Sequence, residues 1–372
     1  MHHSRSKTAS SWKLQSTHMP STSADIQVGL IGFGMAGRVF HAPVISAVPG
    51  LRLAAILQRS GGDAAARYPK ARVVSTLEEL LAIQEIRLVV IATSNASHFD
   101  LARRCLLAGR DVVVDKPFTT NWQEANELVR LARERSRLLT VFQNARWHGD
   151  FQTVRKLVGA GILGRLVLYE AHYERYRPQL RPGAWRERAE PGSGVLFDLG
   201  PHLIDQAMLL FGTPEALSAD VRIEREGAAV DDAFDVTLHY KSLRVALRAT
   251  MLACGPDLRF ALHGTRGSYV KFGHDLQEEA LKRGEIPRDD TWGTEPEEKW
   301  GSVYTEKDGN IVAQPLPTER GDYRRYYENV RDAILGRAAI DVTSQQALNV
   351  MRALELAQES SRKRCTLPWR SE

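Results

Sequence analysis

Three residues far apart in the chain have the types that proton chemistry at a hydroxyl or carbonyl group requires. Lys116 follows the apolar segment 112–114 and precedes Pro117. An ammonium group there could orient a substrate hydroxyl and stabilise negative charge that develops on its oxygen. Asp198 and His202 are four residues apart, so they would share one face of a helix. A carboxylate beside an imidazole fixes its tautomer, which suits a general base near neutral pH.

The same residues also fit a purely structural role. Lys116 could be a surface residue, and Asp198 could cap a helix with His202 satisfied nearby. Because Pro201 is tolerated only in the first turn of a helix, the helix should begin close to Asp198. An apolar stripe at helical spacing follows, formed by Leu199, Leu203, Ala207 and Leu210.

A glycine-rich turn near the start of the chain has the spacing of a dinucleotide-binding loop. Residues 26–31 have the apolar pattern of a buried strand, GFGMAG follows at 32–37, and a helix is expected over 35–47. This context gives weight to a motif that is weak alone, and phosphates would bind at the helix N-terminus. The alternative is a glycine-rich turn without a ligand. The turn residues expected at the cofactor are Gly32, Phe33, Gly34, Met35 and Gly37.

The end of the second expected strand, 51–57, bears on the choice of cofactor. NAD-specific sites usually place Asp or Glu there to bind the ribose 2′-hydroxyl. This chain has Gln58, Arg59 and Ser60 and no carboxylate. Arg59 could pair with a 2′-phosphate and Ser60 could donate a hydrogen bond to it, unless Arg59 is a solvated loop residue. The sequence therefore predicts NADP in preference to NAD, with NAD still possible.

The order of elements predicts an α/β chain with two folded domains. Strands and helices alternate over 25–144, which is typical of a parallel sheet covered by helices on both faces. Over 145–372 strand candidates follow one another with little helix between them, which is typical of an antiparallel sheet. The polar stretch 273–320 is expected to have partial structure or to form a flap. Residues 1–24 are interpreted as a disordered leader or a tag.

Four motifs in this order resemble the Gfo/Idh/MocA family of oxidoreductases: GFGMAG, TSNASH at 93–98, DKP at 115–117 and DLGPH at 198–202. The third departs from the usual Glu-Lys-Pro in one residue, Asp115. The resemblance implies a Rossmann domain and then an α/β domain with a mostly antiparallel open sheet, through which copies pair as homodimers or homotetramers. It also implies site residues. These are Lys116, Asp198 and His202 as the catalytic set, and Thr93, Asn95, His98, Lys116 and Pro117 at the cofactor.

Two further segments resemble the NADP-dependent scyllo-inositol dehydrogenase branch of that family. They are QNARWHGDF at 143–151, where His148 stands in a position that is commonly Asp, and YERYRP…WRE within 173–187. Arginine and aromatic side chains suit sugar recognition, although the tryptophans could instead be core residues and the arginines solvated. The candidate substrate residues are Arg146, Trp147, Asp150, Tyr176, Arg177, Trp185 and Arg186.

The resemblance implies hydride transfer between a nicotinamide and a CH–OH or ketone group of a cyclitol, polyol or sugar. His202 would move the hydroxyl proton and Lys116 would hold the same oxygen. Two alternatives remain. One is a non-enzymatic, sugar-responsive regulator that binds NAD(P), and the other is a reductase of another carbonyl or diol.

Composition argues against several other classes of function. The 372 residues carry a formal charge of +5, but residues 1–24 and 362–372 contribute all of that surplus, so neither nucleic acid nor a membrane is expected as a partner. Three widely spaced cysteines without Cys/His ligand spacing predict no disulfide framework and no metal site, and fit the cytoplasm. No apolar stretch approaches the roughly 18 residues that a membrane span requires.

Overall fold

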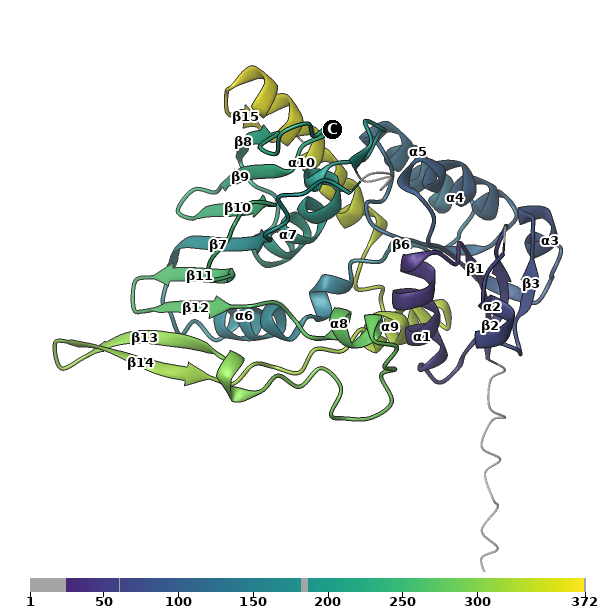
Figure 1. Cartoon of the computed structure of the whole chain (residues 1–372), viewed down its shortest axis with the longest axis horizontal. Coiled ribbons are helices and arrows are strands. Elements are labelled where there is room, and N and C mark those ends of the chain that lie inside the picture. Colours follow the sequence, from purple (N-terminus) through teal and green to yellow (C-terminus); the bar gives the residue numbers. More distant parts are fainter. Residues whose placement is uncertain (1–24, 60, 182–186, 371–372) are drawn as a thin grey trace, which may run out of the picture.

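The computed structural model describes residues 25–59, 61–181 and 187–370, which form two domains side by side (Figure 1). The first domain contains a parallel sheet of six strands in the order β3-β2-β1-β4-β5-β6. Chain order reverses between β1 and β4, and open parallel sheets bind ligands at the carboxyl ends of strands beside such a switch point. The strands are β1 (Ile26–Ile31), β2 (Leu51–Leu57), β3 (Arg72–Val74), β4 (Ile86–Ile91), β5 (Asp111–Val114) and β6 (Leu139–Val141).

Helices between these strands cover the parallel sheet, as the alternating pattern predicts. Strand β5 is buried at every position, as expected for a strand covered on both faces. The helix expected over 35–47 is present, but its middle is a π-helical segment, η1 (Gly37–His41), followed by α1 (Ala42–Ser46). The remaining helices of this domain are α2 (Ala64–Arg67), α3 (Leu77–Leu81), η2 (Asn95–Ser97), α4 (His98–Leu107) and α5 (Trp122–Glu134).

The second domain contains a sheet of nine strands in the order β14-β13-β12-β11-β7-β10-β9-β8-β15. Strands β7 and β10 are parallel, and the other pairs among the described strands are antiparallel, so the prediction of a mostly antiparallel sheet is confirmed. The strands are β7 (Leu166–Glu174), β8 (Ala216–Arg222), β9 (Ala233–His239), β10 (Arg244–Thr250), β11 (Leu258–Gly264), β12 (Ser268–Phe272), β13 (Gly301–Lys307), β14 (Asn310–Leu316) and β15 (Leu367–Pro368).

The polar stretch 273–320 is more regular than its composition indicates. It contains α8 (Gln277–Lys282), η5 (Glu297–Lys299) and the hairpin β13–β14, which forms one edge of the nine-stranded sheet (Figure 1). The hairpin could not be predicted from the sequence because its side chains are mostly exposed, so neither strand has the alternation of a half-buried strand. The other helices among the described residues of this domain are η3 (Asn144–Trp147), α6 (Gly149–Gly159), α7 (Val195–Phe211), α9 (Arg324–Ile334) and α10 (Ser344–Lys363).

Helix α7 begins one turn earlier than predicted. It starts at Val195 rather than near Asp198, and Pro201 therefore lies inside the helix. The early start is explained by Asp231, whose backbone carbonyl accepts from Val195 N at 2.9 Å and whose carboxylate accepts from Leu196 N at 2.7 Å. This residue satisfies N–H groups of the first turn, so Asp198 is not needed as a cap.

The last long helix, α10, packs against both domains. It contacts α5 and β6 of the first domain as well as α7 and β8 of the second. At the junction, Trp122 N donates to the Glu355 carboxylate at 2.7 Å. One apolar core runs through both domains and includes Leu128, Leu203 and Leu354. The helices of the described residues include none that is both long and apolar enough to cross a membrane.

Candidate active site

A cavity of about 1370 Å³ opens between the two domains. The first domain contributes the glycine turn and the loops that follow β2, β4 and β5. The second domain contributes the first turns of α7, the end of β7 and part of α8. A cavity placed at the carboxyl ends of parallel strands is where this type of fold binds a dinucleotide.

Each glycine of the turn has a separate steric reason. Gly32 has φ +94°, and a Cβ there would lie 2.6 Å from the Ala92 carbonyl oxygen. A Cβ on Gly37 would lie 2.0 Å from the Gly32 carbonyl oxygen, so helix and strand could not pack as closely. Around Gly34 no atom lies within 4 Å of such a Cβ, which leaves the backbone open to a ligand. This cradle fits a pyrophosphate. Phe33 and Met35 also line the cavity.

The end of β2 offers one cationic group, Arg59, to the cavity and no carboxylate. Arg59 is exposed and lines the cavity together with Gln58, while Arg38 lines it from η1. Ser60, the other predicted residue here, lies outside the described residues. The arrangement can hold a phosphate on the ribose as well as the pyrophosphate.

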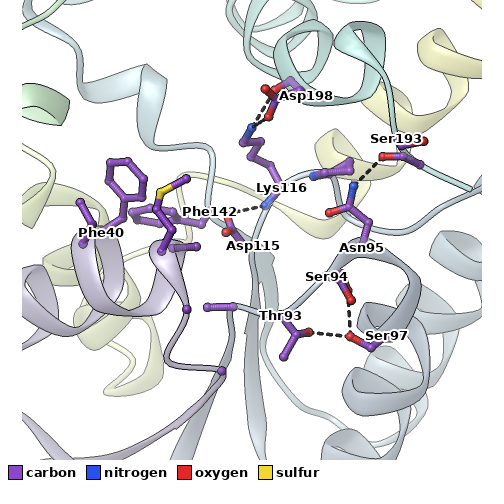
Figure 2. A pocket seen from close by; sticks show the side chains of 18 of the residues that line it. Phe40, Thr93, Ser94, Asn95, Ser97, Asp115, Lys116, Phe142, Ser193 and Asp198 are labelled. Atoms are coloured by element: carbon purple, nitrogen blue, oxygen red, sulfur yellow. Dashed lines mark hydrogen bonds and ion pairs between the residues drawn. The ribbon is translucent and has the colours of Figure 1, made fainter. Parts of the chain in front are cut away.

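The loop after β4 forms another part of the wall. Ser97 Oγ donates to Thr93 Oγ1 at 2.7 Å (Figure 2). Asn95 Nδ2 donates to the Gly192 carbonyl of the second domain at 2.6 Å. His98 does not line the cavity as predicted, since it is fully buried behind the wall. Its Nδ1 lies 2.9 Å from the Pro117 carbonyl oxygen, and burial lowers its pKa. It therefore holds the β4 and β5 loops together.

Lys116 and Asp198 meet in the cavity, although 82 residues separate them. Lys116 Nζ lies 3.1 Å from Asp198 Oδ1 and donates to the Asp198 backbone carbonyl at 2.7 Å (Figure 2). On the other side of the lysine, its backbone N–H donates to Asp115 Oδ1 at 2.8 Å. The ammonium group is thus held at a fixed place in the cavity wall.

His202 lines the cavity one turn after Asp198. Burial lowers its pKa well below 6.5, and the positive charge of Lys116 lowers it further. The imidazole is therefore neutral at pH 7 and can accept a proton. Its Nδ1 has no hydrogen-bond partner within the described parts of the chain.

Three of the predicted substrate residues point into the protein instead. Arg146 is buried and holds the Asp205 carboxylate through two hydrogen bonds of 2.7 Å. Asp150 is buried and accepts from Arg259 Nε at 2.9 Å. Trp147 is a core residue against Tyr326. None of these three lines the cavity: Arg146 and Asp150 each bond a buried partner, and Trp147 packs in the core, so the structure does not bring the three predicted substrate residues to this site.

The remaining predicted substrate residues divide differently. Arg177 lines the cavity, whereas Tyr176 is 58% exposed and does not. Trp185 and Arg186 lie outside the described residues. Several other residues line the cavity that were not among the predicted ones. Tyr173 and Arg175 could have been predicted, because alternate residues of an extended segment share a face with Arg177. Asn144, Glu278 and Lys282 also line the cavity, and no pattern in the sequence indicates them.

The fold and the cavity define an NAD(P)-binding oxidoreductase of two domains. A profile described as the NAD-binding Rossmann fold of the oxidoreductase family matches residues 26–143, and its C-terminal alpha/beta domain matches 155–368. The chain belongs to the Gfo/Idh/MocA family. No group of three His, Cys, Asp or Glu side chains among the described residues is placed to hold a metal ion.

Relatives cover almost the whole chain. It is 44% identical to the uncharacterised oxidoreductase YdgJ of Escherichia coli (strain K12), over 93% of this chain and 99% of YdgJ. It is 36% identical to scyllo-inositol 2-dehydrogenase (NADP(+)) IolW of Bacillus subtilis (strain 168), over 92% of this chain and 95% of IolW. Among solved structures, oxidoreductase yvaA from Bacillus subtilis matches with a TM-score of 0.90 and 35% identity, covering 94% of this chain and all of yvaA.

Proposed function

We propose that the protein is an NADP(H)-dependent dehydrogenase or reductase that acts on a CH–OH or ketone group of a cyclitol, polyol or sugar. The observation that carries this proposal is the shared cavity: Lys116, Asp198 and His202 line the same space as the glycine turn. Similarity to a scyllo-inositol 2-dehydrogenase (NADP(+)) supports both the substrate class and the cofactor. The arginine at the end of β2 supports NADP independently.

The cofactor, when bound, supplies the hydride acceptor or donor at its nicotinamide ring. The glycine turn would hold the pyrophosphate and Arg59 the 2′-phosphate. In the oxidation direction, neutral His202 takes the proton of the substrate hydroxyl, and it returns that proton in reduction. Lys116 donates a hydrogen bond to the same oxygen and stabilises its developing negative charge. Asp198 positions the ammonium group through their ion pair.

Turnover can be followed by nicotinamide absorbance at 340 nm with NADP and a panel of cyclitols, polyols and sugars. We expect His202→Ala to lower kcat by about 10²–10⁴-fold, the usual contribution of a general base, while NADPH still binds. The matched control is His263→Ala, because His263 lies at the far end of β11, bonded to Ser268 and outside the cavity.

Two outcomes would contradict the proposal. Normal turnover by the His202→Ala protein would show that His202 is not the general base. Tight NADPH binding with no turnover of any compound by the unmodified protein would favour the sugar-responsive regulator instead.

A further inference from the structure

The end of β7 continues as an extended segment that points cationic side chains into the cavity. Arg175 N donates to the Thr250 carbonyl at 3.0 Å and Arg177 N to the Met251 carbonyl at 2.7 Å. In extended backbone every second side chain lies on one face. Tyr173, Arg175 and Arg177 accordingly all line the cavity. The ring of Tyr173 lies 6.1 Å from that of His202, so this face continues directly from the proposed catalytic base.

Neither guanidinium group in this segment has a partner among the residues that the structure describes. Within the described residues, no side-chain hydrogen bond or ion pair reaches Arg175 or Arg177, although both are partly buried. Arg181, further along the chain, also lines the cavity and is exposed. Arginine side chains without partners at the wall of a cavity are available to a ligand.

The acidic side chains of this half of the cavity are already engaged. Asp198 is paired with Lys116, and Glu278 Oε1 lies 2.7 Å from Lys282 Nζ. Glu187 Oε1 lies 3.3 Å from Arg225 Nη1. Asp231 accepts hydrogen bonds from the first turn of α7. In the described parts of the chain no acidic side chain is therefore left to pair directly with Arg175 or Arg177, and Asp198 and Glu278 act on Arg177 only through longer-range charge.

Holding these cations together without an anion is unfavourable. The pKa of Arg177 is lowered by burial and then by the neighbouring charges of Arg175 and Arg181. The charges of Asp198 and Glu278 act in the opposite direction but do not cancel this shift. A bound anion would relieve the repulsion, and a planar guanidinium group matches a carboxylate or a phosphate in geometry.

We propose that Arg175 and Arg177 bind an anionic substituent of the substrate, a carboxylate or a phosphate, while its reacting carbon lies between Lys116 and His202. The physiological substrate is then a sugar acid or a sugar phosphate rather than a neutral polyol. This inference rests on the proposed function and narrows its substrate class. Neutral hydroxyl groups could accept hydrogen bonds from the same arginines, but they would leave the charge repulsion uncompensated.

Three compounds that differ only at C6, the carbon outside the sugar ring, test the proposal: D-glucose, D-glucuronate and D-glucose 6-phosphate. Their kcat/KM values with NADP are compared, and their binding to the NADPH-loaded protein is measured by calorimetry. We expect at least one of the two acids to exceed glucose by about tenfold or more in kcat/KM and in affinity. The two acids distinguish carboxylate from phosphate, and added salt should reduce the advantage of the acids.

Variants test whether the segment that carries Arg175 and Arg177 causes the preference for an acid. In Arg177→Gln the ratio of the acid to glucose should fall toward one through a higher KM for the acid. Arg165→Gln is the matched control. Arg165 immediately precedes the first residue of β7, at the end of the strand away from Arg177, and it is exposed and lies outside the cavity. Its ratio should equal that of the unmodified protein.

The possible failures can be told apart. Equal kcat/KM and affinity for glucose and both acids, or an equal loss on all three compounds in Arg177→Gln, would overturn the anionic substrate. Turnover of glucose with no advantage for the acids would leave the proposed function intact. Binding of an acid that depends on Arg177, without turnover of any sugar, would support the anion site and contradict the proposed dehydrogenase activity.

Discussion

Arg59 is the side chain on which the proposed cofactor preference depends. It is exposed at the edge of the cavity, after a strand that ends without a carboxylate. In Arg59→Ala we expect the Kd for NADPH to rise by about 10- to 100-fold, the loss of one charge-assisted contact to a phosphate, while the Kd for NADH stays constant. Fluorescence titration with both cofactors measures this. Arg52→Ala is the control, since Arg52 is exposed on the same strand but outside the cavity.

That control makes the result specific. If Arg59→Ala binds NADPH as tightly as Arg52→Ala does, the arginine is a solvated loop residue and does not choose the cofactor.

The environment of His202 predicts an unusual pH profile. Its pKa is well below 6.5, because burial and the charge of Lys116 both disfavour the imidazolium ion. A lowered pKa keeps the base neutral at lower pH, so kcat/KM for alcohol oxidation should not fall as pH decreases through 6.5. The loss should begin only below that value, in the window set by the lowered pKa. Because kcat/KM reports the free enzyme, the profile can be compared directly with this structure. An acidic midpoint at or above 6.5 would contradict the expectation.

The role of a residue could be predicted where the residue stands in a short local motif. It could not be predicted where a partner far away in the sequence determines which way the side chain points. The glycine turn, Lys116 and His202 stand in short motifs whose spacing reflects one turn or one helix face. The direction of Arg146 depends on Asp205, 59 residues further on, and that of Asp150 on Arg259, 109 residues further on. Those pairings form only in the folded chain.

At the scale of elements, the position of α7 depends on Gly194. This residue has φ +87° and ψ 167°, a conformation open essentially to glycine alone. A Cβ there would also lie 2.1 Å from Asp231 Oδ1, on the carboxylate that holds the first turn. We expect Gly194→Ala to lower the free energy of unfolding by about 1–3 kcal/mol and to lower kcat, since α7 carries Asp198 and His202. Urea unfolding and kinetics measure both effects.

Gly159→Ala provides the comparison for that substitution. Gly159 is the last residue of α6, and no atom lies within 4 Å of the Cβ it would gain. This variant should be at least as stable as the unmodified protein, because alanine favours a helix. If the two alanine variants have similar free energies of unfolding, the backbone at position 194 accepts a side chain without strain, and the expectation for Gly194→Ala is contradicted.

The elements themselves were predictable to different degrees. Strands such as β4 and β5 contain continuous apolar runs, at 88–91 and 112–114, and α10 has a clear amphipathic pattern, so their positions follow from sequence. The start of α7 did not, because its capping residue, Asp231, comes 35 residues later than Leu196. The β13–β14 hairpin has no buried face of its own and is positioned by pairing with β12.

At the scale of the whole molecule, one face of the nine-stranded sheet is suited to self-association. Tyr169 packs against Phe211 of α7, so residues at alternate positions face the other way. A row of mostly short side chains crosses neighbouring strands there. Its members, paired in register, are Val270, Ala261, Glu170, Ala246 and Thr237.

We propose that copies of the chain pair through this face as dimers or tetramers. A long cation in the middle of the row should separate them, so Ala246→Arg is expected to be a monomer by light scattering. Ala160→Arg, an exposed position after α6, should keep the mass of the unmodified protein. A monomeric unmodified protein, or an Ala246→Arg protein of unchanged mass, would contradict the proposal.

Helix α10 also determines when the molecule can fold during its synthesis. The apolar faces of α5 and α7 are covered by residues 344–363, which emerge from the ribosome last among the long helices described here. Until then, the faces of α5 and α7 that α10 covers remain accessible in both domains at once. Nascent chains with exposed apolar surface are the ones that chaperones retain. A chain cut before residue 344 is therefore expected to be degraded as a whole rather than to survive as a cofactor-binding fragment.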